Sequence, residues 1–212
     1  MAWRFYQDWI LPRCLDLAMR NGRLAPYRQR LLSKAKGRVL EIGVGSGLNL
    51  AFYSHSVTEI VGLEPHPKLL AMARRKPCGI PLTLVEGSAE AIPLDKASVD
   101  MVVSAWTLCS IPNVALALRE ARRVLRPDGK FLFVEHGLAP EAGVRRWQHR
   151  LNPAWKRLAG GCHLNRPISD LVAQAGFDID YLQTGYLEGP QPLTFTYEGG
   201  ARRCNDGKGG GK

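Results

Sequence analysis

The sequence predicts a doubly wound α/β fold: a mostly parallel, seven-stranded sheet that ends in an antiparallel C-terminal hairpin. From residue 37 onward, short apolar runs typical of buried strands alternate with runs typical of helices, and this alternation indicates a parallel sheet covered on both faces. The first apolar run ends in a glycine-rich loop, and the last two runs look like a hairpin. Ligands of such folds bind at the carboxyl ends of the strands.

The first segment is expected to be helical, because Trp3, Tyr6, Ile10 and Leu11 recur near the 3.6-residue period of a helix, with a break at Pro12. The main strands are expected at 38–42, 59–63, 82–85, 99–104 and 130–135, the last after a turn at 126–129. Helices are expected at 48–53, 67–75, 114–125, 144–158 and 168–175, and the hairpin strands at 178–183 and 193–197.

A chain of 212 residues fits one ordinary domain. We expect a helical lid or cap at 1–36, the main domain at 37–204 and a flexible tail at 205–212, where NDGKGGGK has no apolar surface to bury. No apolar run approaches a membrane span, and charges interrupt the first twenty residues, so no secretory signal is expected. The protein is therefore predicted to be cytoplasmic. Its N-terminal helix, aromatic on one face and basic on the other, is the candidate for a peripheral membrane contact.

The five cysteines are scattered and form no C-x-x-C pair, which excludes a zinc knuckle or a thioredoxin-type motif. We expect reduced thiols and no metal site. The net charge of +10 could attract nucleic acid, anionic membranes or acidic small molecules, but the basic residues lie in small separate groups typical of a solvated surface.

The glycine loop is the strongest chemical signal. Gly43, Gly45 and Gly47 directly follow the first strand, where glycine permits positive φ and close approach of a ligand to the backbone. A dinucleotide fingerprint requires G-x-G-x-x-G, and in either register a leucine, Leu48 or Leu50, replaces the third glycine.

Two acidic residues indicate what the loop binds. Glu41 precedes the loop, where a carboxylate favours a cationic ligand, and Glu64 closes the second strand, where it can accept hydrogen bonds from both hydroxyls of a ribose. A ligand with a ribose, a positive charge and no phosphate fits S-adenosylmethionine (SAM).

Four motifs together resemble the class I SAM-dependent methyltransferases, in their small-molecule, ubiquinone-biosynthesis-like (type 11) branch: E-x-G-x-G-x-G, G-L-E at the second strand, G-S-A-E-A-I-P-L at 87–94 and R-V-L-R-P-D-G-K at 123–130. The resemblance implies a Rossmann-like fold and SAM as cofactor, with S-adenosylhomocysteine as product. It places the three glycines at the methionine and ribose, Glu41 near the amino group, Glu64 at the ribose hydroxyls, Ser88, Ala89 and Glu90 beside the adenine, and Ser104 and Ala105 beside the methionine. Ser88 departs from the family pattern, because many relatives carry an acid there.

The second half is similar to the microsomal alkyl thiol methyltransferases of animals and their bacterial relatives, in Leu108-Cys109-Ser110, Glu135-His136 and Gly161-Cys162-His163 among other motifs. This implies a small lipophilic acceptor, with a thiol sulfur as the preferred nucleophile.

Methyl transfer depends chiefly on alignment, and a thiol reacts as its thiolate. His136 and His163 are the candidates for raising the thiolate fraction, although either could instead order a loop. Cys109 is expected to line the acceptor pocket rather than to act as a nucleophile.

Other functions remain open at this point. Phospholipid or other small-molecule N- or O-methylation is the main alternative, followed by SAM binding without catalysis and by a dehydrogenase. Nucleic-acid methylation is disfavoured, because the [DN]-P-P-[FYW] motif that holds a flipped base is replaced by Ser104-Ala105-Trp106-Thr107. The expected partner is a small-molecule acceptor, with no nucleic acid, and the protein is expected to be a monomer or homodimer.

Overall fold

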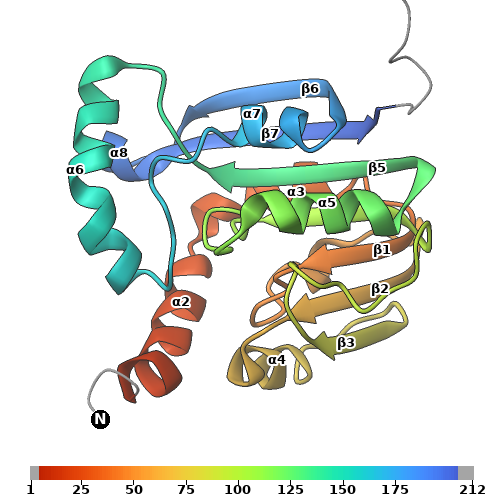
Figure 1. Ribbon diagram of the computed structural model, residues 1–212. Coiled ribbons are helices and arrows are strands. Elements are labelled where there is room, and N and C mark those ends of the chain that lie inside the picture. The colour runs from red at the N-terminus through yellow and green to blue at the C-terminus, as the bar shows by residue number, and fades with distance from the viewer. Residues whose placement is uncertain (1–4, 205–212) are drawn as a thin grey trace, which may run out of the picture.

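The sheet of the computed structural model has seven strands in the order β3-β2-β1-β4-β5-β7-β6 (Figure 1). Strands β1 to β5 are parallel, and β7 lies antiparallel between β5 and β6. The predicted fold class is therefore confirmed. The structure describes residues 5–204, without the side chains of residues 7 and 8. The strands are β1 (Gly37–Ile42), β2 (Val57–Glu64), β3 (Leu82–Glu86), β4 (Val99–Ala105), β5 (Leu125–His136), β6 (Phe177–Tyr186) and β7 (Phe195–Arg203).

Helices cover both faces of the sheet. Because side chains alternate along a strand, β1 sends Leu40 to a core shared with α5 and α7, and Val39 to a core shared with α3 and α4. The α-helices are α2 (Leu11–Met19), α3 (Ala25–Leu32), α4 (Pro67–Ala73), α5 (Val114–Val124), α6 (Ala142–Leu158), α7 (Ile168–Gln174) and α8 (Gln191–Thr194), with a π-helix at Tyr6–Ile10 and 3₁₀ turns at Gly22–Leu24 and Leu50–Phe52.

The strand order reverses between β1 and β4, so the loops after these strands diverge and leave a crevice at their carboxyl ends. The arrowheads of β1, β2 and β5 point toward the side of the molecule where α2 and α6 lie (Figure 1). This edge is where the site is built.

Three predicted elements differ from the structure. The helix expected at 48–53 is only the 3₁₀ turn Leu50–Phe52, because Tyr53 is already extended, with φ −69° and ψ 136°. The chain does not break at Pro12; the π-helix continues directly into α2, with Pro12 as the second residue of α2. The turn expected at 126–129 lies within β5, as an excursion between the pairs Val99–Leu125 and Met101–Lys130.

The second hairpin strand is longer than predicted. It extends to Arg203 through Gly199 and Gly200. Because glycine is depleted in strands, these two residues weaken the sequence signal for the second half of the strand. Glycine is required at both positions because a larger residue would clash. A Cβ on Gly199 would lie 2.4 Å from the ring of Phe133, and one on Gly200 would lie 2.4 Å from the ring of Tyr181.

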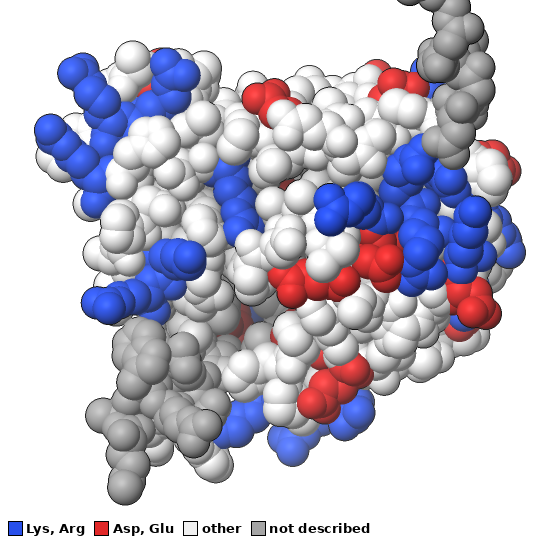
Figure 2. All heavy atoms as spheres, viewed as in Figure 1, with Lys and Arg blue, Asp and Glu red and all other residues white. Residues whose placement is uncertain are grey.

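The expectations about surfaces are only partly addressed. Trp3 and the tail at 205–212 lie outside the described residues. Within residues 5–204, no helix has both the length and the hydrophobicity that crossing a membrane requires. The peripheral membrane contact stays a prediction, and the exposed side chains that it would cover are Phe5, Trp9, Ile10 and Leu17. On the face shown in Figure 2, basic side chains lie in separate groups with acidic ones between them.

Candidate functional site

A cavity of about 570 Å³ lies at the carboxyl ends of β1, β2 and β4, and α2 and α6 contribute to its wall. This volume is typical of sites for small molecules. A recess opens on the face shown in Figure 2, between α2 and the ends of β1 and β2. Its lining is mainly apolar, and the only carboxylates among the described lining residues belong to Asp16 and Glu64.

The glycine loop forms one wall of the cavity. Gly43, Gly45 and Gly47 all have positive φ, at 69°, 56° and 77°, so the sequence correctly singled out three positions that favour glycine. Their surroundings differ. A Cβ on Gly43 would lie 2.3 Å from the Thr107 side chain, whereas a Cβ on Gly45 would meet no atom closer than 3.9 Å. Gly45 is thus the position where a ligand can lie directly on the main chain.

Glu64 faces the same space from the end of β2. Its two carboxylate oxygens accept the N–H groups of Gly45 at 3.0 Å and His66 at 2.9 Å. Burial raises the pKa of this carboxyl, and the two backbone hydrogen bonds oppose the shift. Each oxygen keeps a further lone pair, so Glu64 can still accept hydrogen bonds from a ligand.

Glu41 does not occupy the predicted position beside a ligand. It is completely buried, and among the described residues it does not line the cavity. Its oxygens accept hydrogen bonds from Asn49 Nδ2 at 2.7 Å and the Tyr53 hydroxyl at 2.8 Å. Glu41 lies on the strand face that points toward the α3 core, so its carboxylate acts through Asn49, which does line the cavity. Asn49 in turn accepts a hydrogen bond from Arg28 Nε at 2.8 Å.

The pKa of Glu41 gives a test of this arrangement. Burial raises it to about 7, against the hydrogen bonds from Asn49 and Tyr53. Between the ordinary pKa of glutamate and about pH 7, the folded state therefore holds more protons than the unfolded state, and stability falls as the pH rises. We expect this carboxyl to lower the free energy of unfolding by up to about 3 kcal/mol between pH 4.5 and 8.

Urea unfolding across this pH range measures the effect. Glu41→Gln should show a smaller fall in stability than the wild type, and Glu86→Gln, a change at an exposed glutamate, should follow the wild type. Equal falls in all three proteins would contradict the raised pKa of Glu41.

The segment before β1 supplies two charged residues that the sequence analysis missed. Asp16 of α2 is buried and accepts a hydrogen bond from the Ser46 hydroxyl at 2.6 Å, which ties α2 to the glycine loop. Arg28 of α3 lies over the Trp106 ring at 5.0 Å. Both line the cavity. An acid among the apolar positions of α2 is the one sequence signal that could have revealed this.

The segment after β3 carries Ser88 and Ala89, which line the cavity as the adenine prediction requires. Glu90 does not line it: its carboxylate accepts the Asn113 N–H instead. The predicted contact of the Glu90 side chain with a ligand is therefore not supported, because that side chain points to α5.

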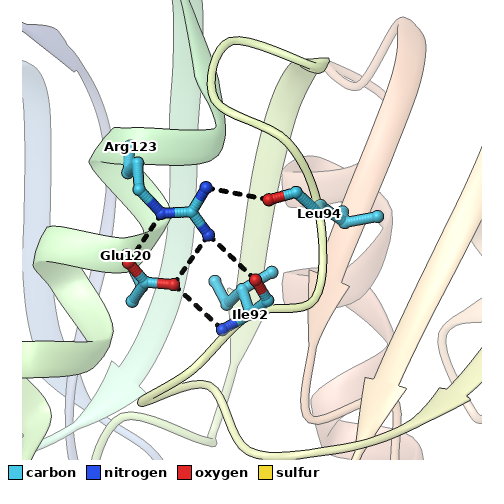
Figure 3. A network of polar contacts seen from close by, with 4 residues as sticks. All are labelled: Ile92, Leu94, Glu120 and Arg123. Carbon is cyan, nitrogen blue, oxygen red and sulfur yellow. Dashed lines mark hydrogen bonds and ion pairs between the residues drawn. The ribbon is translucent and has the colours of Figure 1, made fainter.

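A polar network holds this segment in place (Figure 3). The Arg123 guanidinium on α5 donates to the carbonyls of Ile92 and Leu94, both at 2.8 Å, and to the Glu120 carboxylate at 2.7 and 2.8 Å. Glu120 also accepts the Ile92 N–H at 3.0 Å. Its hydrogen bond with Arg123 lowers the pKa of Glu120, so the pair stays charged. Arg123 of the R-V-L-R motif thus fixes the backbone of the segment after β3, which carries the residues predicted to lie beside the adenine.

Glu135 organises the loop after β4 and was not assigned a role from the sequence. It is completely buried at the end of β5. Oε1 accepts hydrogen bonds from the Ser104 hydroxyl at 2.7 Å and the Thr107 N–H at 3.1 Å, and Oε2 accepts the Cys109 N–H at 3.4 Å. Ser104 is therefore turned to Glu135 and does not line the cavity as predicted, whereas Ala105 does.

The candidate catalytic residues divide into two kinds. Cys109 and His136 line the cavity. His163 does not: its Nδ1 lies 3.1 Å from the Cys109 carbonyl oxygen, which fits the alternative in which it orders a loop. Cys162, which had no assigned role, lines the cavity with its Sγ 3.4 Å from both Cys109 Sγ and His136 Nδ1. The structure thus brings two thiols and one imidazole together.

Comparisons with known proteins find related methyltransferases. The methyltransferase domain family model matches residues 40–133. Human thiol S-methyltransferase TMT1A is 34% identical over 178 residues, 77% of this chain and 72% of that protein. Phosphatidylethanolamine N-methyltransferase of Cereibacter sphaeroides is 34% identical over 139 residues, 63% of this chain and 66% of that protein. A SAM-dependent methyltransferase of Thermotoga maritima has the same fold, with a TM-score of 0.68 at 21% identity over 95% of this chain and 98% of that one.

Proposed function

The chain belongs to the SAM-dependent methyltransferases, and from this membership we propose that it transfers a methyl group from S-adenosylmethionine to the sulfur of a small, lipophilic thiol. SAM supplies a methyl group already activated on a sulfonium sulfur. The protein then has to bind the donor, align the acceptor and exclude water.

The residues present fit this donor. The open space at Gly45 admits a ligand to the main chain, and Glu64 has oxygens left to accept ribose hydroxyls. Asp16 and Arg28 place one negative and one positive side chain on the cavity wall, as the amino and carboxylate groups of a methionine require. In this proposal Asp16, whose carboxylate also pairs with Arg20 at 2.7 Å, takes the role first assigned to Glu41.

The acceptor end of the cavity carries the proposal of a thiol. Beyond the donor-binding residues the lining is mainly apolar. The polar side chains in this part of the lining include Cys109, His136 and Cys162. No further carboxylate lines the cavity in the described part of the chain, so an alcohol or an ammonium group would find no carboxylate to take its proton at this end, where the nearby imidazole is that of His136. A thiol needs less help, since it ionises far more readily than an alcohol and its thiolate is a strong nucleophile. The similarity to TMT1A supports the same acceptor class.

Lipid amine methylation is the second candidate, because the apolar lining would accept an acyl chain and because a phosphatidylethanolamine N-methyltransferase is among the relatives. The two candidates differ in the atom that receives the methyl group.

A matched acceptor series separates them. The protein would be incubated with methyl-labelled SAM and an alkyl thiol, the alcohol and the amine of the same chain length, or vesicles of phosphatidylethanolamine. We expect label in the thioether at a rate at least about tenfold above the other products, because the thiol is the most nucleophilic acceptor at neutral pH. Label found only in the alkyl amine, the ether or the lipid would overturn the thiol assignment and leave the methyltransferase assignment intact.

A further inference from the structure

We propose that Cys109, His136 and Cys162 form a zinc site whose fourth coordination position faces the cavity. The role of this site in activating the acceptor thiol rests on the function proposed above, whereas the binding of zinc does not. The proposal departs from the expectation that the chain has no metal site.

The ligand atoms already have nearly the required spacing. Zinc binds sulfur at about 2.3 Å and imidazole nitrogen at about 2.0–2.1 Å, so neighbouring ligand atoms of a tetrahedral site lie about 3.5–3.8 Å apart. Here Cys162 Sγ lies 3.4 Å from Cys109 Sγ and 3.4 Å from His136 Nδ1. The three ligand atoms all lie within 4.8 Å of one another, and within residues 5–204 they are the only group of this kind. To complete the geometry of the metal site, Cys162 would shift slightly outward, and Cys109 Sγ and the His136 ring nitrogen, which lie within 4.8 Å of each other, would have to come to about 3.5 Å.

Three separate backbone segments hold these ligands. Cys109 follows β4, His136 ends β5, and Cys162 follows α6 after Gly160 and Gly161, which both have positive φ. The Cys109 N–H is bound by Glu135, and the Cys109 carbonyl accepts the His163 N–H at 2.8 Å. The ligands therefore converge through the fold and not through a local sequence motif, which explains why spacing alone did not reveal them.

The electrostatic environment suits a divalent ion. Two thiolates balance the charge of Zn²⁺, and the buried carboxylate of Glu135 is accompanied by the buried guanidinium of Arg166, which donates to the carbonyls of Leu108 and Ile111. His136 Nδ1 faces Cys162 Sγ at 3.4 Å, while Nε2 is buried and has no hydrogen-bond partner in the described part of the chain. Two sulfurs and one imidazole form a soft ligand set that favours zinc over magnesium or calcium.

The fourth coordination position of the zinc would bind the acceptor thiol. Catalytic zinc sites with Cys₂His ligands keep their fourth position open for substrate, and all three residues line the cavity that receives the acceptor. The acceptor S–H bond breaks, its proton passes to solvent, and the sulfur binds the metal as a thiolate. The acceptor sulfur forms the new bond to the methyl carbon while the bond between the methyl carbon and the sulfonium sulfur breaks. The electron pair of the broken bond stays on the donor sulfur. The neutral thioether product is a weaker ligand than the thiolate and leaves.

Metal content and cobalt spectroscopy test the site without measuring turnover. The whole protein, purified under reducing conditions and dialysed, should carry about one Zn²⁺ per chain by mass spectrometry. Cys109→Ser, Cys162→Ser and His136→Gln should each retain about a tenth of it or less, since each removes one of three ligands. Cys14→Ser, at an exposed cysteine, is the control and should retain it all. Circular dichroism shows whether each variant is folded.

Cobalt reports the fourth position. Co²⁺ added to metal-free protein should give the visible bands of a tetrahedral site and a thiolate-to-cobalt band, and an alkyl thiol should shift these bands while the matched alcohol should not. Folded protein that binds neither metal, or that gives the same cobalt bands after loss of any of the three ligands, would overturn the proposal, as would a Cys109–Cys162 disulfide in place of metal.

The outcomes also separate this proposal from the proposed function. Zinc bound by these three residues in a protein that methylates only amines would refute the thiol function and leave the metal site in place. Undiminished methylation of thiols by metal-free protein would leave the thiol function in place and refute the role of zinc in activating the acceptor.

Discussion

Gly45→Val is expected to lower the affinity for SAM and S-adenosylhomocysteine by at least about a hundredfold, or about 2.7 kcal/mol. Gly45 has a φ of 56°, a conformation that is a genuine outlier for a β-branched residue. The protein itself leaves room for the new side chain, because the nearest atom to a Cβ would be 3.9 Å away. That room is the space in which the ligand would approach the main chain, so the valine takes the place of the ligand.

Titration calorimetry with both compounds measures the loss. Gly185→Val in β6 is the matched control, because a Cβ there meets no atom within 4 Å and the position lies outside the residues that line the cavity. It should bind both compounds as the wild type does. An unchanged affinity in folded Gly45→Val would show that the donor does not rest on this loop.

Glu135→Ala is expected to lower the free energy of unfolding by at least about 3 kcal/mol. Removal of the carboxylate leaves the Ser104 hydroxyl and the N–H groups of Thr107 and Cys109 without their acceptor in a buried region, and each unsatisfied donor costs about 1–3 kcal/mol. The loop at 105–109 would also lose the group that orders it, so methyl transfer should fall even at temperatures where the variant is folded.

Urea unfolding compares this variant with Ser104→Ala, which removes one donor and leaves Glu135 with its backbone partners. The serine variant should lose about 1 kcal/mol. A similarly small loss in both variants would contradict the central role of Glu135, and full methyltransferase activity in folded Glu135→Ala would contradict its effect on the loop.

The sequence predicts well where local and periodic signals dominate. Parallel strands, covering helices and a reversal of strand order follow from apolar runs and glycine positions, and these place Gly45 and Glu64 correctly at one edge of the sheet. The error at Glu41 has a simple cause: position at the end of a strand does not determine to which face of the sheet a side chain points. Alternation along β1 puts Glu41 on the same face as Val39, toward the α3 core, and there Asn49 and Tyr53 donate hydrogen bonds to its carboxylate.

The missed residues depend on contacts between distant segments. Asp16 reaches Ser46 across 30 positions, Glu135 reaches Ser104 across 31, and Cys162 reaches Cys109 across 53. A local sequence pattern spans too few residues to contain either member of such a pair together with the other. A single cysteine therefore does not indicate a ligand site until the fold brings a second cysteine close to it.

The place of β7 has a consequence for how the protein is made. This strand, at residues 195–203, lies inside the sheet, and it pairs Glu135 with Tyr197 and His136 with Thr196. The edge of β5 that carries these two residues therefore has no neighbour until Thr196 and Tyr197 have left the ribosome. Pairing between such distant segments is slow and leaves an unpaired strand edge exposed in the meantime. The reactive end of the cavity is thus completed only after the chain has been synthesised through this strand, by the last strand of the sheet to emerge.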